Sequence, residues 1–278
     1  MTYSIVALDA DTGELGVAVQ SRAFNTGAVV PWGAPGIGVV ATQSYSEPAY
    51  GPLGLELLRA GKTPERALAA LVAADEEPQY RQVAILDAEG RVAVHVGDEC
   101  IPAAGFTAGD GFSAQGNMVD SARVWEAMAE VFERSRGSLA QRLLAALDAA
   151  EEAGGDWRGR QAGAILVVPA EGQPWEREVD LRVDDHPDPL GELRRLLTLR
   201  IAYGAMREPP GATEEQVAVL HELDARWARI YGAAATGDIE TARELLRPLL
   251  QQEPRWADFV RTLGDRELLP NALALLEA

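Results

Sequence analysis

The sequence predicts an α+β fold, in which a four-layer αββα sandwich is followed by a small all-α domain. In the first part of the chain, segments with the pattern of strands come in antiparallel pairs, and segments with the pattern of helices come in pairs as well. A parallel α/β fold would instead alternate single strands with single helices. Beyond about Leu190 the pattern is almost wholly helical. We therefore expect two antiparallel sheets between outer helices in residues 1–189, and a helical domain in residues 190–278.

Strands are predicted where β-branched, aromatic and aliphatic residues gather or alternate between turn residues. The first hairpin joins residues 4–8 to 14–21 through the turn cluster Asp9-Ala10-Asp11-Thr12-Gly13. The segment 101–116 is rich in glycine and is expected to be irregular, with one short strand. Further strands are predicted at 28–31, 37–43, 82–87, 91–96, 163–169 and 179–183.

Helices are predicted from amphipathic spacing and from signals at their ends. Thr63 and Pro64 mark one start, because threonine is a common N-cap and proline fits the first helical turn. The helices of the first domain are expected at 50–60, 64–74, 121–135 and 138–153. After a polar connection that contains prolines, those of the second domain are expected at 190–205, 213–232, 239–251 and 256–277.

Composition limits the class of protein. The 278 residues are 47% hydrophobic, which is enough for a packed core, and they carry a formal net charge of −18. A surface this acidic repels polyanions, so neither nucleic acid nor a membrane is expected as a partner. The single Cys100 excludes an internal disulfide framework. Residues 1–20 lack the features of a signal peptide, and there is no run of about 18 apolar residues. The sequence therefore predicts a cytoplasmic protein without a transmembrane helix.

Thr2 is the first candidate for chemistry, since it follows Met1 and opens a predicted buried strand. A methionine aminopeptidase accepts a small second residue such as threonine. Removal of Met1 would give one residue both a hydroxyl nucleophile and a free α-amine. An α-amine titrates near pH ~8, so a good part of it is neutral at cell pH and can take the hydroxyl proton without a histidine. Thr2 is therefore the predicted catalytic nucleophile, although many proteins begin Met-Thr for no catalytic reason.

Ser21 and Arg22 end the second predicted strand. If the first two strands pair through their turn, both residues flank Thr2 and join the predicted catalytic group. Arg22 would then hold a substrate carboxylate, or lower the pKa of the α-amine through its own charge. The alternative is that Arg22 is a solvated strand end.

Two side-chain amides are candidates to stabilise a tetrahedral oxyanion. Gln43 ends an apolar strand in polar residues, as strands that open onto a pocket often do. Asn117 stands in the turn Gln115-Gly116-Asn117-Met118 before a helix, and Gln115 of the same turn is predicted to bind substrate. Each amide has a structural alternative, since Gln43 could cap the following turn and Asn117 could cap the helix.

The loop 154–161 contains two glycines and more charge than a plain connection needs. We predict that Asp156, Arg158, Arg160 and Gln161 contribute to substrate binding. The alternative is an ion pair between aspartate and arginine that only braces the loop.

No cofactor and no metal are expected. The cluster Asp184, Asp185, His186 and Asp188 has the composition of a divalent-metal site and is kept as an alternative. It lacks a second histidine nearby, and its prolines indicate a rigid linker.

Several separated segments together resemble one known family. They are MTYSIVALDADTGELGVAVQS, GIGVVATQS, QGNM, GGDWRGRQ and DLRVDDHPDP, and they are similar to the DUF1028 family of the N-terminal-nucleophile (Ntn) hydrolase superfamily. The resemblance covers roughly residues 1–200. It implies the αββα sandwich, Thr2 as nucleophile and hydrolysis of an amide. The tail beyond about Leu190 resembles the peptidoglycan-binding-like helical domain that often follows this family's core.

The chain differs in one respect from proteasome-type members of that superfamily. They use a lysine beside the threonine, whereas the one lysine here, Lys62, is predicted in a loop before a helix. Arg22 would have to replace it, and a permanently charged guanidinium cannot shuttle a proton. This argues against a proteasome-like mechanism and leaves the α-amine as the base.

The leading prediction is an amidohydrolase that acts on a small amide or peptide-like substrate. One alternative is a non-catalytic binding protein whose helical tail binds a glycan or a protein partner. The other is a metal-dependent hydrolase at Asp184–Asp188. Because Ntn sandwiches commonly assemble, we also expect a homo-oligomer.

Overall fold

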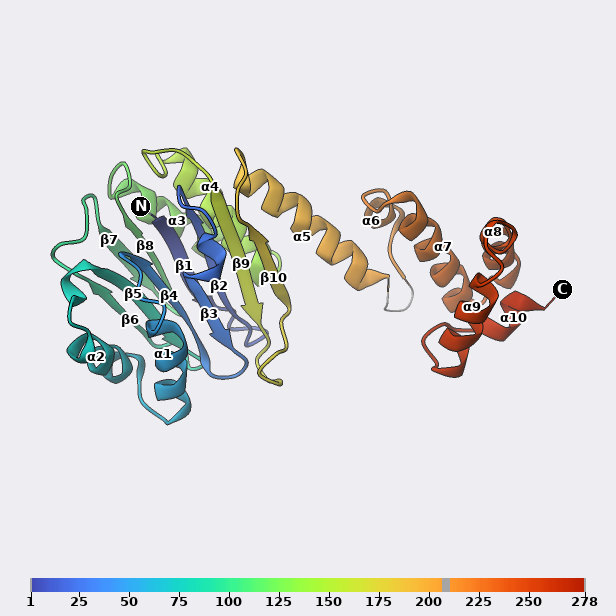
Figure 1. Ribbon diagram of the computed structural model, residues 1–278, viewed down its shortest axis with the longest axis horizontal. Coiled ribbons are helices and arrows are strands. Elements are labelled where there is room, and N and C mark those ends of the chain that lie inside the picture. Colours follow the sequence, from blue (N-terminus) through green and yellow to red (C-terminus); the bar gives the residue numbers. More distant parts are fainter. Residues whose placement is uncertain (1, 207–210, 278) are drawn as a thin grey trace. The chain divides into compact units, whose positions relative to one another are not determined.

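The computed structural model describes residues 2–206 and 211–277, so the predicted removal of Met1 lies outside the described residues. The chain divides into two compact units, Met1–Arg195 and Leu196–Ala278. The division falls within helix α5 (Pro189–Ala205), which is labelled in Figure 1.

The first unit is built on two antiparallel sheets. The larger sheet contains β1 (Thr2–Leu8), β2 (Leu15–Ser21), β7 (Gly105–Gly109), β8 (Phe112–Asn117), β9 (Ala162–Val168) and β10 (Val179–Val183). Its strand order is β10-β9-β2-β1-β8-β7. The smaller sheet contains, in spatial order, β3 (Pro31–Ala34), β4 (Gly38–Ser44), β5 (Arg81–Asp87) and β6 (Val92–Val96). All neighbouring strands pair antiparallel, as the sequence predicts.

Each sheet carries a pair of helices (Figure 1). Helices α1 (Tyr50–Arg59) and α2 (Pro64–Ala74) contact the smaller sheet. Helices α3 (Arg123–Arg134) and α4 (Leu139–Glu152) contact the larger one. A capping box of Ser138 and Gln141 begins α4, because each side chain satisfies a backbone N–H of the first turn.

An apolar core lies between the two sheets. Successive side chains of a strand point to opposite faces, so alternate residues of each strand reach this layer. Val6 and Val17 of the larger sheet share it with Val39 and Leu86 of the smaller sheet, and all four are fully buried. The other face of β4 and β5 packs on α1 and α2, which explains why these strands are continuously apolar in sequence.

The glycine-rich segment 101–116 is more regular than predicted. It forms both β7 and β8, which are joined by a turn in which Gly111 has a positive φ of 69°. Strand β8 pairs with β1 along nearly its whole length and is buried throughout. This pairing and burial override the weak intrinsic strand propensity of glycine.

Two of the helices predicted in the second unit are each divided into two shorter helices. The expected helix at 213–232 is divided into α6 (Glu214–Val217) and α7 (Glu222–Thr236), because His221 adopts an extended conformation. The expected helix at 256–277 is divided into α9 (Trp256–Asp265) and α10 (Ala272–Leu276). Pro270, which has no N–H to donate, lies in this second interruption. Between them, α8 (Ile239–Gln252) begins at Asp238, whose side chain accepts the N–H of Thr241.

Within the described residues, none of the helices is long and apolar enough to cross a membrane.

Shortening Leu86 tests the core between the sheets. Leu86 is fully buried, so we expect Leu86→Ala to lower the free energy of unfolding by about 2–5 kcal/mol through lost apolar burial and a residual cavity. Leu53→Ala is the matched control, because Leu53 of α1 is 51% exposed and its loss should cost only about 0.5 kcal/mol. Urea denaturation followed by circular dichroism measures both. Equal losses for the two variants would contradict this packing.

Candidate functional site

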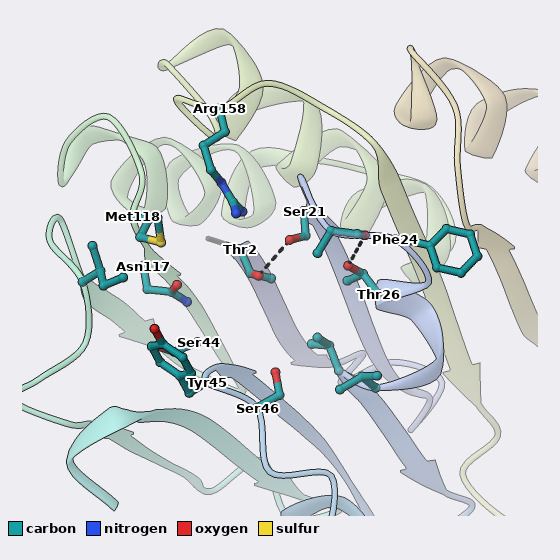
Figure 2. Close-up of a pocket in the computed structure, with 14 residues that line it drawn as sticks. Thr2, Ser21, Phe24, Thr26, Ser44, Tyr45, Ser46, Asn117, Met118 and Arg158 are labelled. Carbon is teal, nitrogen blue, oxygen red and sulfur yellow. Dashed lines mark hydrogen bonds between the residues drawn. The ribbon is translucent and has the colours of Figure 1, made fainter.

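Thr2 opens β1, which lies between β2 and β8 in the larger sheet. The antiparallel registers set Thr2 opposite Ser21 on one side and opposite Asn117 on the other. Thr2 is only 6% exposed, and its Oγ1 lies 3.0 Å from Ser21 Oγ (Figure 2). The predicted hairpin of β1 and β2 therefore brings Ser21 to Thr2, and the pairing of β1 with β8 adds Asn117.

Tyr3 anchors the same end of β1 from the opposite face. Its hydroxyl donates a hydrogen bond of 2.7 Å to Glu151 Oε2 at the end of α4. Burial, and after it the neighbouring Glu151 carboxylate, raises the pKa of Tyr3 well above its ordinary value, so the phenol stays protonated and donating. The head of β1 is thus held in place beside Thr2.

A cluster of buried amides extends the site between the sheets. Gln82 Nε2 donates to two backbone carbonyls, those of Gly105 at 3.2 Å and Gly116 at 2.8 Å. Gln82 Oε1 accepts from Gln43 Nε2 at 2.7 Å and from Asn117 Nδ2 at 3.0 Å. All three side chains are buried.

The bonds of Gln82 fix the orientation of every amide in this cluster. A carbonyl oxygen can only accept, so the Gln82 nitrogen must face the two carbonyls and its oxygen must face Gln43 and Asn117. Gln43 Nε2 also donates to the carbonyl of Thr2 at 3.4 Å, so both of its hydrogens are used. Asn117 Nδ2 has one further hydrogen, and Asn117 lines a pocket, whereas Gln43 does not.

Gln115 lies deeper between the sheets than Asn117. Its Nε2 donates to Ser4 Oγ at 2.7 Å, and its Oε1 accepts from Ser113 Oγ at 2.9 Å. Gln115 is fully buried and lies outside the lining of the pocket.

The pocket at Thr2 has a volume of about 380 Å³. It is lined by Thr2, Ser21, Ala23, Phe24, Thr26, Val29, Val30, Ser44, Tyr45, Ser46, Ile101, Asn117, Met118 and Arg158 (Figure 2). Hydroxyl groups and apolar surface dominate this lining. Arg158 is the one charged side chain among the lining residues that the structure describes.

Arg158 belongs to the loop between α4 and β9, and Figure 2 shows its guanidinium directed toward Thr2 and Ser21. The buried Asp156 holds it through a bond of 3.2 Å from Nη2 and through the backbone N–H of Arg158. Asp156 also accepts the backbone N–H of Arg22 at 2.8 Å. The predicted ion pair of the loop is therefore present, and its arginine lines the pocket.

Three other candidates lie away from this pocket. Arg22 is exposed at the end of β2 and does not line it. Arg160 pairs with Glu151 at 2.8 Å and with Asp188 at 3.4 Å. Gln161 Nε2 donates to Asp185 Oδ1 at 3.0 Å.

The acidic cluster at 184–188 is tied into the chain by its own hydrogen bonds. His186 Nδ1 accepts the backbone N–H of Asp188 at 3.0 Å, and the oxygens of Asp185 and Asp188 bond Gln161 and Arg160. In the described part of the chain, no group of three or more histidine, cysteine, aspartate or glutamate side chains is arranged to hold a metal ion.

Gln82 is the residue that sequence reasoning missed. It looks like an isolated polar residue near the start of a strand. A usable signal exists, because β4 and β5 are antiparallel and adjacent, so the polar end of β4 must meet the start of β5. The register pairs Gln43 with Gln82 directly.

Comparison with known proteins identifies the family. Residues 2–193 match the family of unknown function DUF1028, and the chain belongs to that family. A DUF1028 protein from Silicibacter pomeroyi is 35% identical, with a TM-score of 0.65, over 70% of this chain and 87% of its own. Among curated proteins, no match to this sequence was found.

Two structures of Anbu, the ancestral beta-subunit, are more distant. The protein from Yersinia bercovieri is 12% identical over 74% of this chain and 98% of its own, with a TM-score of 0.33. A Gly-1 mutant from Hyphomicrobium sp. is 14% identical over 75% of this chain and 100% of its own, with a TM-score of 0.35. They are too dissimilar to inform the site.

Removing the Gln82 amide tests the cluster. Gln82→Met leaves two carbonyls without a donor and two amide nitrogens without their acceptor, so we expect a loss of at least about 2 kcal/mol in unfolding free energy. Gln173→Met, at an exposed position of the same unit, is the control and should change little. Urea denaturation measures the difference. A Gln82→Met protein as stable as the control would show that the amide bonds contribute nothing.

Proposed function

We propose that the first unit is an N-terminal-nucleophile amidohydrolase that acts on a small amide or peptide-like substrate. Membership of DUF1028 and the two antiparallel sheets support this proposal. The helix pairs that contact the two sheets fit the αββα sandwich of that superfamily. Because a fold alone does not define a reaction, the proposal depends on the site.

One observation carries it, namely that Thr2 lies in a pocket without a side-chain base. Among the lining residues that the structure describes there is no histidine, aspartate, glutamate or lysine. A hydroxyl nucleophile requires a neighbouring base. The α-amine that Thr2 would have after removal of Met1 is such a base, and it belongs to the same residue.

Other nucleophiles fit the site less well. Ser21, Ser44 and Ser46 also line the pocket, but none of them can carry an α-amine of its own. Cys100 lies outside the lining, and burial raises the pKa of its thiol, which disfavours the reactive thiolate.

In the proposed reaction, Thr2 Oγ1 attacks the amide carbonyl and its proton passes to the α-amine. A tetrahedral oxyanion forms. The carbon–nitrogen bond then breaks, and the α-ammonium gives its proton to the leaving amine. Water attacks the resulting Thr2 ester with the α-amine again as base, which releases a carboxylic acid and restores Thr2.

Asn117 is the better oxyanion donor of the two predicted amides. Gln43 already donates both of its amide hydrogens, one to Gln82 Oε1 and one to the carbonyl of Thr2. Asn117 retains one, lines the pocket, and is oriented by Gln82 before substrate arrives. Such preorganised donors lower the free energy of a charged transition state without further rearrangement.

Arg158 takes the electrostatic role that the sequence suggested for Arg22. A positive charge directed toward Thr2 disfavours the protonated α-amine, lowers its pKa and so enlarges its neutral fraction. Arg158 can also attract a carboxylate on the substrate. A glycan or protein partner of the helical tail, and assembly into a homo-oligomer, stay predictions.

The first experiment combines intact mass with covalent labelling. We expect purified protein to lack one methionine. A small β-lactone should then acylate Thr2 Oγ1 by ring opening and add its full mass. Thr2→Ala should abolish labelling although its α-amine is still exposed, whereas Thr2→Ser should retain it.

Thr26→Ala is the matched control, because Thr26 lines the same pocket but bonds the carbonyl of Ala23. The Thr26→Ala variant should be labelled to the same extent as the protein without substitutions. Retained Met1, or labelling that survives Thr2→Ala, contradicts the proposal and favours a non-catalytic binding protein.

A second experiment measures the pH dependence of labelling. Arg158→Met removes the charge that disfavours the ammonium form, so the α-amine pKa should rise and the midpoint of the labelling rate should move up by about one pH unit. Arg22→Met, an exposed neighbour outside the pocket, is the control and should leave the midpoint in place. Equal profiles for the two variants would exclude this role for Arg158.

A further inference from the structure

The second unit contains a separate pocket of about 480 Å³. Four aromatic side chains line it, from Tyr203, Trp227, Tyr231 and Phe259, together with the carboxylate of Asp224. All of them lie within Leu196–Ala278, so this aromatic pocket is formed by one compact unit. Its volume is in the range of sites for small ligands.

The helices explain how these side chains gather. Asp224, Trp227 and Tyr231 follow each other on α7 at spacings of three and four residues, so they share one helix face. Helix α5 contributes Tyr203 and α9 contributes Phe259.

Two of the four lining rings, those of Trp227 and Phe259, contact each other. The ring centroids of Trp227 and Phe259 are 5.3 Å apart, with planes at 53°. Trp256 stacks on Trp227 at 5.6 Å and meets Phe259 edge-on at 5.4 Å. Phe259 nevertheless remains 44% exposed, so a ligand can reach the cluster.

Asp224 gives the aromatic pocket its charge. Asp224 is the one charged side chain among the lining residues that the structure describes. It forms no ion pair within residues 2–206 and 211–277. The hydroxyl of Tyr203 donates to Asp224 Oδ2 at 2.6 Å. This bond raises the pKa of Tyr203, so the tyrosine hydroxyl stays protonated and donates to the carboxylate.

We propose that the aromatic pocket binds a small organic cation that carries a trimethylammonium or similar alkylated ammonium group. The faces of aromatic rings are electron-rich and attract cations, and alkylated ammonium groups are recognised by cages of such rings. Asp224 adds a direct charge attraction. A metal ion would need more oxygen ligands than this single carboxylate. An anion would be repelled. This site is independent of Thr2 and of the proposed hydrolysis.

The test compares choline with 3,3-dimethylbutanol, which has the same shape without the charge. Each is titrated into the full chain, with binding followed by tryptophan fluorescence and calorimetry. We expect saturable binding of choline and at least roughly tenfold weaker binding of the neutral alcohol. No saturation by choline, or equal binding of both compounds, overturns the proposal.

Two variants locate the binding. Asp224→Asn keeps the size of the side chain and an acceptor for Tyr203, and should weaken choline binding about tenfold. Phe259→Leu keeps apolar surface but removes one ring, and should weaken choline without affecting the neutral alcohol. Asp265→Asn removes the same charge from an exposed site outside the pocket and is the control. If Asp224→Asn binds choline as Asp265→Asn does, the assignment is wrong.

Discussion

The pairing of β1 with antiparallel strands on both sides is the constraint on which the candidate site depends. Because β2 and β8 run opposite to β1, the end of each meets the start of β1, and Ser21 and Asn117 arrive at Thr2 from opposite sides. A shift of either register by one residue would turn these side chains to the other face of the sheet. The apolar residues further along the same strands prevent such a shift, since it would turn Val6 and Val17 away from the apolar core between the sheets.

The space between the sheets is therefore divided into two zones with different physical roles. The apolar zone supplies burial free energy, whereas the amide zone around Gln82 supplies orientation. A buried amide that lacks a partner costs about 1–3 kcal/mol, so such a cluster persists only where its bonds are nearly complete. Gln43 Oε1 has no partner among the described residues. Unsatisfied groups of this kind are rare in native proteins.

Much of the fold could be predicted because its signals are local. The turn at Asp9–Gly13 and the alternation that follows it identify the first hairpin, and that hairpin alone brings Ser21 to Thr2. The sequence predicts Asn117 in a turn, whereas the structure places it at the end of β8. A glycine-rich segment has the pattern of irregular structure, and pairing with β1 makes this one a strand. Gln82 can be recognised only once β4 is paired with β5, since its importance lies in four bonds to groups far away in sequence. Long-range contacts of this type leave no periodicity in the chain.

The loop between α4 and β9 shows why bracing a loop and lining a site need not be alternatives. Gly154 and Gly155 both have positive φ angles, which let the chain turn tightly enough to bury Asp156 against the end of β2. The same carboxylate accepts two backbone N–H groups and the guanidinium of Arg158. A long arginine side chain loses much entropy when it is fixed, and this buried partner offsets part of that loss. The pair that closes the loop is thus also what keeps a positive charge in the pocket beside Thr2, where the proposed chemistry needs a neutral amine.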